Sequence, residues 1–173
     1  DEQVIYQNDF EMDAAAADIG GNKALEFTVE GDPENSWVTV FQQDLLFEYA
    51  DPIYSGAVLS FDLILPEKAS YTGVLKAQAV TKMGSEWTWT QSGVIPEISI
   101  NDFKKAEKGY KKVGVSIPFG PEIEAQRGLR AVVPCLAASN CDYNGRIYLD
   151  NVKLVNGKPS KNETELPAVD PII

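Results

Sequence analysis

Histidine is absent from this sequence of 173 residues, and cysteine occurs only twice. Without histidine there can be no Ser-His-Asp triad, no Cys-His catalysis, no HExxH zinc site and no metal site built on imidazole. Carboxylates, lysine and tyrosine remain available for acid–base chemistry, and oxygen atoms remain available as metal ligands. The chain also lacks a run of about 20 apolar residues, the length that a membrane-spanning helix needs. We therefore expect no membrane-spanning segment.

Positive charge is scarce: 15 Lys and Arg face 26 Asp and Glu, for a formal net charge of −11. An acidic chain repels phosphate backbones and anionic lipids, so we expect neither a nucleic acid nor a membrane as a partner. The hydrophobic share of 44% and the charged share of 24% are close to the average for globular proteins. Length and composition together predict one globular domain.

The two cysteines, Cys135 and Cys141, lie six residues apart around a stretch with turn signals, Ala-Ala-Ser-Asn. Two thiolates cannot complete a four-thiolate zinc site. One interpretation is a pair of reduced thiols. The other is a disulfide that closes a small loop at the mouth of a hairpin, which suits an exported protein. We favour the disulfide.

Short runs of apolar and β-branched residues, separated by Gly, Pro, Asn and Asp, indicate β-strands along the chain. We predict strands at residues 4–7, 24–29, 37–41, 57–65, 73–81, 86–91, 111–117, 129–135 and 146–155. The Asn144-Gly145 pair predicts a hairpin turn, because both residues tolerate positive φ. Many short strands without strand–helix alternation predict an all-β fold, an antiparallel β-sandwich or barrel.

The composition changes near the C-terminus. Residues 157–173 include Gly-Lys-Pro-Ser-Lys-Asn-Glu-Thr-Glu-Leu-Pro, which is polar, contains proline and is typical of a linker. We therefore predict a β-sandwich over residues 1–156 and a linker or tail over residues 157–173. No signal peptide is visible at Asp1, so we expect a mature, processed or excised chain.

Two tryptophans, Trp87 and Trp89, are two residues apart in a predicted strand and therefore share one face of it. They could face the core, because Trp is on average a well-buried residue. They could instead form an exposed platform, since sugar rings present flat C–H faces that stack on aromatic rings. We favour the platform for at least one of the pair, with Trp37 as a third candidate.

Polar side chains accompany this pair. Lys76 and Gln78 share one face of the preceding strand, and Arg130 interrupts an otherwise apolar run. The plain interpretation is a solvated face and a structural ion pair. The functional one is that these three side chains bind the hydroxyls of a glycan, for which the fork of donors on arginine is well suited.

An oxygen-ligand metal site is conceivable where the first and last predicted strands meet. Glu11 follows the first strand and Asp150 lies in the last, so adjacent strands would bring both carboxylates to one Ca²⁺ ion. On the residues alone, two surface carboxylates are the preferred interpretation.

A hydrolase would need a pair of carboxylates flanking the scissile bond. Glu122 with Glu124, or Glu97 with Asp102, are possible pairs, but neither lies in a recognisable catalytic pattern. The Glu-x-Asp-x-x-Glu signature of sandwich-fold glucanases is missing.

Both ends of the domain carry a family resemblance. The opening Val4-Ile-Tyr-Gln-Asn-Asp-Phe-Glu11 and the closing Gly145-Arg-Ile-Tyr-Leu-Asp-Asn-Val-Lys-Leu-Val155 resemble galactose-binding-like jelly-roll carbohydrate-binding modules. With its Trp pair, long central strands and acidic, linker-bearing layout, the chain looks most like the mannan-binding, family 27-type modules of β-mannanases. Related modules for xylan, β-glucan or cellulose have the same ends. The chain departs from the pattern by lacking a Gly-Trp pair soon after the first strand.

The resemblance implies a jelly-roll sandwich without catalysis, a structural Ca²⁺ held by Glu11 and Asp150, and an aromatic groove for a β-linked glycan. We therefore expect a secreted, extracellular module, covalently linked to a glycoside hydrolase, that targets a plant polysaccharide, with mannan as the first candidate. One alternative is a jelly-roll polysaccharide lyase or hydrolase. Another is a structural domain packed on a catalytic neighbour.

Overall fold

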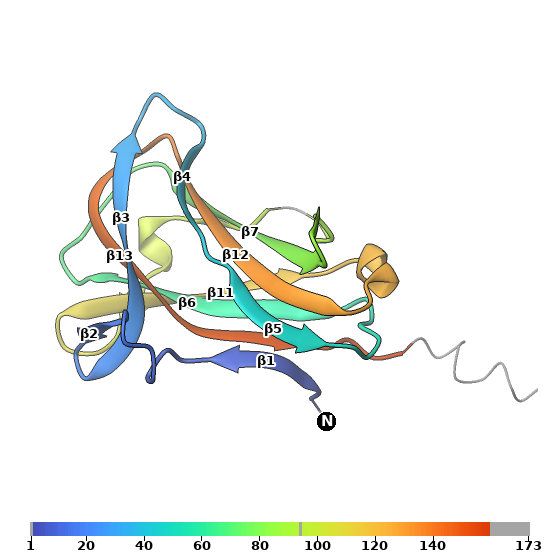
Figure 1. The fold of residues 1–173 in the computed structure, drawn as a ribbon. Coiled ribbons are helices and arrows are strands. Elements are labelled where there is room, and N and C mark those ends of the chain that lie inside the picture. Colours follow the sequence, from blue (N-terminus) through green and yellow to red (C-terminus); the bar gives the residue numbers. More distant parts are fainter. Residues whose placement is uncertain (1, 94, 160–173) are drawn as a thin grey trace, which may run out of the picture.

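The computed structural model describes residues 2–93 and 95–159, which form two antiparallel β-sheets packed against each other (Figure 1). The all-β prediction, an antiparallel jelly-roll sandwich, is confirmed. The predicted domain boundary at residue 156 falls just after the last strand. Residues 160–173 of the predicted linker lie outside the described residues.

One sheet has seven strands among the described residues, in the order β10-β11-β6-β13-β3-β2, and β1 also pairs with β13. Its strands have these bounds: β1 Val4–Asn8, β2 Ala17–Ile19, β3 Asn22–Asp32, β6 Val58–Pro66, β10 Lys104–Lys105, β11 Tyr110–Pro118 and β13 Cys141–Val155. The first and last strands were predicted to be neighbours. Gln7 of β1 indeed lies opposite Lys153 of β13.

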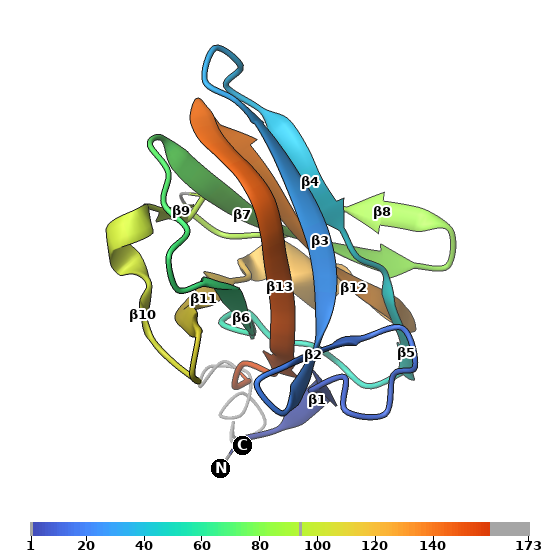
Figure 2. The same ribbon diagram turned by 90° about the vertical axis from the view of Figure 1, so that its left-hand side faces the viewer.

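The second sheet, counted over the same residues, has six strands in the order β4-β12-β7-β8, with β5 beside β12 and β9 beside β7. Its strands have these bounds: β4 Val38–Gln42, β5 Leu45–Tyr49, β7 Val74–Met83, β8 Glu86–Thr88, β9 Glu97–Ile98 and β12 Leu129–Ser139. Figure 2 shows the β7–β8 hairpin projecting at the far edge of this sheet. Strand β8 is shorter than the predicted strand at residues 86–91.

Two short 3₁₀-helices, η1 (Ile100–Asp102) and η2 (Pro121–Ala125), complete the regular structure of the described ranges. Neither is long and apolar enough to cross a membrane. The Ala-rich residues 12–19 form turns and β2.

The core lies between the sheets because alternate residues of each strand point inward. In β7, Leu75, Ala77 and Ala79 are buried in the main core, whereas Lys76 and Gln78 are only partly buried. This alternation agrees with the faces predicted for the strand. It also leaves an outer face on the six-stranded sheet whose side chains are available for function.

The hairpin predicted at Asn144-Gly145 is wrong, because both residues lie inside β13. The glycine serves close packing instead: a Cβ at Gly145 would come within 2.6 Å of the Tyr143 hydroxyl. That hydroxyl donates a hydrogen bond to the carbonyl oxygen of Arg146 at 2.8 Å. The chain passes from one sheet to the other at Asn140, which adopts a positive φ of 47°.

The predicted disulfide is also wrong, because Cys135 and Cys141 are both free and buried. Cys141 packs in the main core, whereas Cys135 belongs to a separate apolar cluster on the outer face of β12. The two thiols therefore point to different sides of the structure. Burial, and secondarily the charge of Asp44, raises the pKa of Cys135 to about 12, so its thiol stays protonated near neutral pH.

Candidate functional site

The outer face of the six-stranded sheet is organised in rows that cross its strands. Cys135 of β12 lies opposite Gln78 of β7 on one side and Gln42 of β4 on the other. The next row along the strands contains Val133 and Val80. Residues directly opposite each other in antiparallel strands share a face, so each row is a continuous strip of surface.

Small side chains make the floor of this face. Ala131, Val133 and Cys135 of β12, together with Val80 of β7, form an apolar cluster separate from the main core. Because β12 runs through the middle of the sheet and carries small outer side chains, the sheet surface is hollowed along it. Larger residues on the flanking strands can then act as walls.

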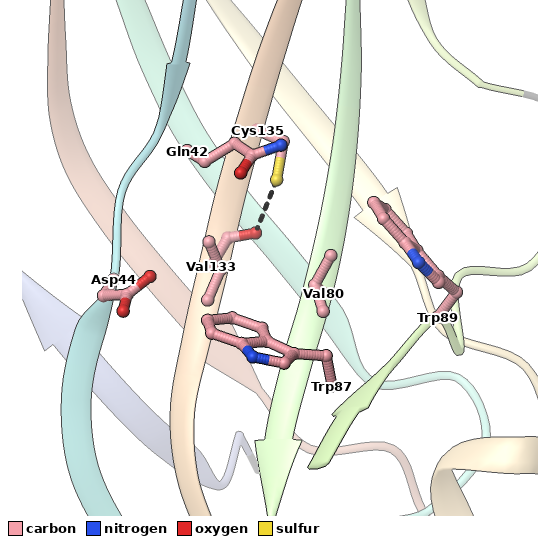
Figure 3. A pocket seen from close by; sticks show the side chains of 7 residues that line it. All are labelled: Gln42, Asp44, Val80, Trp87, Trp89, Val133 and Cys135. Carbon is pink, nitrogen blue, oxygen red and sulfur yellow. Dashed lines mark hydrogen bonds between the residues drawn. The ribbon is translucent and has the colours of Figure 1, made fainter. Parts of the chain in front are cut away.

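Two tryptophans make one wall. Trp87 comes from β8 and Trp89 follows directly after it, and their exposed fractions are 50% and 58%. Both line a hollow of about 370 Å³, with Gln42 and Asp44 on its other side. Figure 3 shows Val80 between the two indoles and Val133 next to the Trp87 ring. The site is an apolar trough between aromatic rings and polar groups, and we call it the groove.

A lysine of the same β7–β8 hairpin contacts the Trp87 ring. Lys82 lies opposite Trp87 in the β7–β8 pair, and its Nζ is 4.8 Å from the centre of the indole ring. This is a cation–π contact, which favours one position of the ring. The hairpin turn contains Gly84, whose φ of 63° is disfavoured for other residues.

The segment after Trp89 is fixed by hydrogen bonds to both sheets. The Gln91 side chain accepts a hydrogen bond from the backbone N–H of Ala79 in β7 at 3.1 Å. The N–H of Ser92 donates to the carbonyl oxygen of Pro118 at 2.8 Å, and Pro118 ends β11 in the other sheet. Trp89 therefore stands on an anchored segment rather than on a free loop.

The other predicted binding residues do not line the hollow of the groove. Gln78 is in the row of Cys135, and Lys76 is one row further, with its Nζ 3.9 Å from a carboxylate oxygen of Glu97. Arg130 lies in a neighbouring hollow, described below. Trp37 is 41% exposed just before β4 but does not line the groove.

Five lining residues were not predicted as binding residues from the sequence: Gln42, Asp44, Val80, Val133 and Cys135. Val80 and Val133 gave no signal, because β12 and the second half of β7 have small or apolar residues on both faces and show little alternation there. Gln42 carried no usable signal, because it comes three residues after Thr39 and strict alternation would put the two side chains on opposite faces. Only the irregularity at Val40 of β4 brings Gln42 to the outer face.

A second cluster of polar residues lies on the other sheet, where β1, β6 and β13 meet. Asp150 of β13 is directly opposite Asp62 of β6, and its exposed fraction is only 5%. The N–H of Asn151 donates to Asp150 Oδ1, and the Asn151 amide donates to Asp62 Oδ2, both at 2.8 Å. Burial raises the pKa of Asp150 to about 6; Asp62, Asp9 and Glu11 add to the rise, whereas the Asn151 N–H opposes it.

Glu11 and Asp150 line the same hollow of about 340 Å³, together with Asp9 and Asn22. The pairing of β1 with β13 brings them together, as the sequence predicted. Glu11 Oε2 also accepts a hydrogen bond from the N–H of Lys23 at 2.9 Å. Among the described residues, no three Cys, Asp or Glu side chains form a ready-made metal cage.

Each pair of carboxylates considered as catalytic contains a residue with a structural partner. Glu124 accepts a hydrogen bond from the N–H of Ser55, and Asp102 accepts one from the N–H of Ser99. None of the four candidates, Glu97, Asp102, Glu122 and Glu124, lines the groove.

Comparisons with solved structures agree with this fold. A carbohydrate-binding module specific for non-crystalline cellulose, CBM28, has a TM-score of 0.63 and 17% identity, over 82% of this chain and 80% of that one. TmCBM27, a module with specific mannan recognition, has a TM-score of 0.64 and 18% identity, over 91% and 99%. CBM27-1 of Caldicellulosiruptor saccharolyticus, solved with mannohexaose, has a TM-score of 0.54 and 21% identity, over 88% and 96%.

A comparison with curated proteins found no match. The family model described as "Carbohydrate binding domain (family 17/28)" matches residues 25–154, which include both strands of the groove floor. The resemblance to galactose-binding-like jelly-roll modules is thus confirmed. The chain belongs to the carbohydrate-binding domain family 17/28.

Proposed function

We propose that this domain is a non-catalytic module that binds a β-linked plant polysaccharide, with β-mannan as the first candidate, in the groove. The observation that carries the proposal is the pair of half-exposed tryptophans beside a floor of small residues. Single exposed hydrophobic residues are ordinary on protein surfaces, but two indoles lining one hollow are not.

The chemistry of a neutral glycan fits this trough. A neutral chain has no charge to be repelled by an acidic protein, so its affinity must come from stacking and hydrogen bonds. Trp offers the largest flat face and has only two χ angles to order. Gln42 and Asp44 stand across the groove from the indoles and offer donors and acceptors for sugar hydroxyls.

The second candidate ligand is amorphous cellulose, favoured by the likeness of the fold to CBM28, a module specific for non-crystalline cellulose. Mannan is favoured by the Trp pair and by the likeness of the fold to TmCBM27, with its specific mannan recognition, and to CBM27-1, solved with mannohexaose. Both are β-linked chains of neutral hexoses with flat ring faces, so the groove supports either. The comparison of the two polymers therefore belongs in the first experiment.

That experiment is depletion of the protein from solution by insoluble mannan, acid-swollen cellulose and insoluble xylan. Trp87→Ala and Trp89→Ala should each weaken binding to the preferred polymer about tenfold or more, a loss of about 1.4 kcal/mol. The matched control is Trp37→Ala, which removes an exposed indole outside the groove and should bind like the parent. Binding that survives both groove variants, or variants that unfold, would contradict the proposal.

Binding without catalysis makes sense when the module is tethered to an enzyme. A tether raises the local concentration of the catalytic domain at an insoluble substrate. We therefore propose a secreted, extracellular glycoside hydrolase as the covalently linked partner. Fusion of this domain to a mannanase should raise hydrolysis of insoluble mannan and leave hydrolysis of soluble oligosaccharides unchanged.

We also propose a structural Ca²⁺ ion between Glu11 and Asp150. The donor set is suitable, because Ca²⁺ takes six to eight oxygen ligands that include carboxylates, amide and backbone carbonyls and water. The buried Asp150 beside Asp62 is a like-charge pair that a cation would stabilise. Excess chelator should lower the melting temperature of the parent, because an ion that binds the folded state stabilises it by mass action.

Glu11→Gln provides the matched variant for that test. It should lower the affinity for Ca²⁺ and reduce the effect of chelator on the melting temperature. Equal melting curves with Ca²⁺ and with chelator, together with no calcium in elemental analysis, would remove the ion from the proposal.

A further inference from the structure

A second hollow of about 360 Å³ lies beside the groove on the six-stranded sheet. Its lining residues come from β5, the β7–β8 hairpin and the start of β12: Leu46, Phe47, Glu48, Lys82, Gly84 and Arg130. Lys82 connects the two sites, because it lines this hollow and its ammonium group also contacts the Trp87 ring of the groove. Ala131, opposite Lys82, belongs to the groove floor cluster. A glycan in the groove can therefore continue into this hollow.

A β-bulge places Arg130 in it. Between Leu129 and Ala131 strand β12 advances by two residues, while its partner β7 advances by one, from Met83 to Lys82. Leu129 packs in the core and Ala131 on the outer face, so Arg130 is the extra residue between them. Bulges re-aim side chains and are frequent beside binding sites. The bulge explains why a run of buried residues contains an exposed arginine.

The charges of this hollow differ from those of the whole protein. Lys82 and Arg130 outnumber Glu48, in a chain with a net charge of −11. Within the described ranges, Arg130 makes no ion pair or hydrogen bond through its side chain, and the contact of Lys82 is with an aromatic ring rather than a carboxylate. Two cations without an anionic partner on the protein are therefore free to meet one on a ligand.

We propose that this hollow is a subsite for the carboxylate of an acidic sugar unit on the glycan that occupies the groove. This inference rests on the proposed function. The planar guanidinium of Arg130 suits a carboxylate because its fork of donors matches the two oxygens. Lys82 adds a second positive charge at the end of the groove. Leu46, with an exposed fraction of 71%, offers an apolar surface for the ring of the same sugar.

The test compares two forms of one polymer: konjac glucomannan and the same glucomannan lightly oxidised at C6 to uronic acid units. Retention of the protein in native gels containing each polymer gives both affinities at low salt. The parent should bind the oxidised form about three to ten times more tightly. Arg130→Gln should lose this preference, because its affinity for the oxidised form falls by more than its affinity for native glucomannan, whereas Arg130→Lys should keep part of the preference because it retains the charge without the fork.

The matched control is Arg146→Gln, which makes the same change of charge on β13 in the other sheet. It should keep the preference of the parent. Weaker binding of the parent to the oxidised polymer than to the native one, or an equal effect of Arg130→Gln and Arg146→Gln, would overturn this subsite alone. A parent that binds neither polymer, nor mannan or cellulose, would overturn the proposed function and this inference with it.

Discussion

Each sheet carries a small apolar cluster on its outer face. One cluster is closed, which means that its aromatic ring is buried in it, and the other is open, because the aromatic rings beside it are exposed. On the seven-stranded sheet, Ile19, Ala24, Ile64 and Tyr148 pack together, and Tyr110 contacts them. The rings of Tyr110 and Tyr148 meet edge to face, with centres 6.0 Å apart. The Tyr148 hydroxyl donates to Glu26 at 3.2 Å, so both the ring and its polar group are satisfied within the protein.

The cluster on the six-stranded sheet is flanked rather than covered. Its two indoles stay at least half exposed, and a hollow separates them from Gln42 and Asp44. Aromatic rings that already pack on their own sheet have little surface left for a ligand. The difference indicates that Tyr148 stabilises the fold, whereas Trp87 and Trp89 keep their faces for a partner.

Replacement of Tyr148 tests the closed side of this comparison most strongly. Tyr148→Ala should lower the free energy of unfolding by about 3 kcal/mol, because it leaves a cavity over Ile64 and a buried cluster without its cover. Binding to mannan or cellulose should be unchanged at a temperature where the variant is folded. Urea unfolding and polymer depletion provide the two measurements.

Tyr148→Phe separates the ring from the hydroxyl. It keeps the packing and loses one hydrogen bond to Glu26, so the expected loss is only about 1 kcal/mol. A Tyr148→Ala variant that unfolds like the parent, or that loses polymer binding while folded, would show that the two clusters do not have different roles.

The aromatic wall of the groove was partly predictable, because it depends on the spacing of residues that are close in the sequence. The spacing of Trp87 and Trp89 predicted that they share a face and favoured an exposed position for at least one of them, and both are at least half exposed. Lys82 lies opposite Trp87 in the β7–β8 hairpin. The pairing of β1 with β13, which brings Glu11 near Asp150, followed from the Asp-Phe-Glu and Leu-Asp-Asn-Val patterns at the two ends of the domain.

Other features depend on tertiary packing and left no local signal. Gly145 follows Asn144, as in a hairpin turn, but the contact that requires a glycine is with the ring of Tyr143. The bulge at Arg130 depends on the register with β7, which a single strand does not reveal. Asp44 lines the groove only because the β4–β5 segment runs beside β12.

Asp150, with Asp62, Asp9 and Glu11 near it, lies on the sheet that carries the closed apolar cluster. The pH dependence of stability tests this group of carboxylates. In chelator, the pKa of Asp150 is about 6 in the folded state, above its ordinary value of 3.8. Between these two values the folded state binds a proton that the unfolded state has released, so stability falls as pH rises and stays lower above pH 6. Asp150→Asn should therefore be more stable than the parent at pH 7 in chelator, by about 1–2 kcal/mol.

Urea unfolding from pH 4 to pH 7 measures this difference, with the exposed Asp51→Asn as a control for net charge. The Asn side chain still accepts the hydrogen bond from the N–H of Asn151. Added Ca²⁺ should stabilise the parent and leave Asp150→Asn nearly unchanged. A parent whose stability rises between pH 4 and pH 6 in chelator more steeply than that of the variant would contradict this account.

The smallest expected effect concerns the contact of Lys82 with the Trp87 ring beside the groove. Lys82→Met keeps the aliphatic stem but removes the charge over the indole ring, a contact worth about 0.5–1 kcal/mol at an exposed site. The β7–β8 pairing still places Trp87 on the outer face, so the melting temperature should hardly change. Affinity for neutral mannan or cellulose should fall about two- to fivefold, because the ring samples other positions before it stacks on a sugar.

Lys82→Arg should restore most of that affinity, since a guanidinium also stacks on an aromatic face. Lys105→Met makes the same change of charge on β10 of the other sheet and should bind like the parent. Fluorescence of the indoles during titration with mannohexaose or cellohexaose measures these affinities. If Lys82→Met binds as tightly as Lys105→Met, the hairpin alone fixes the ring, and the open cluster needs no cation to keep Trp87 in place.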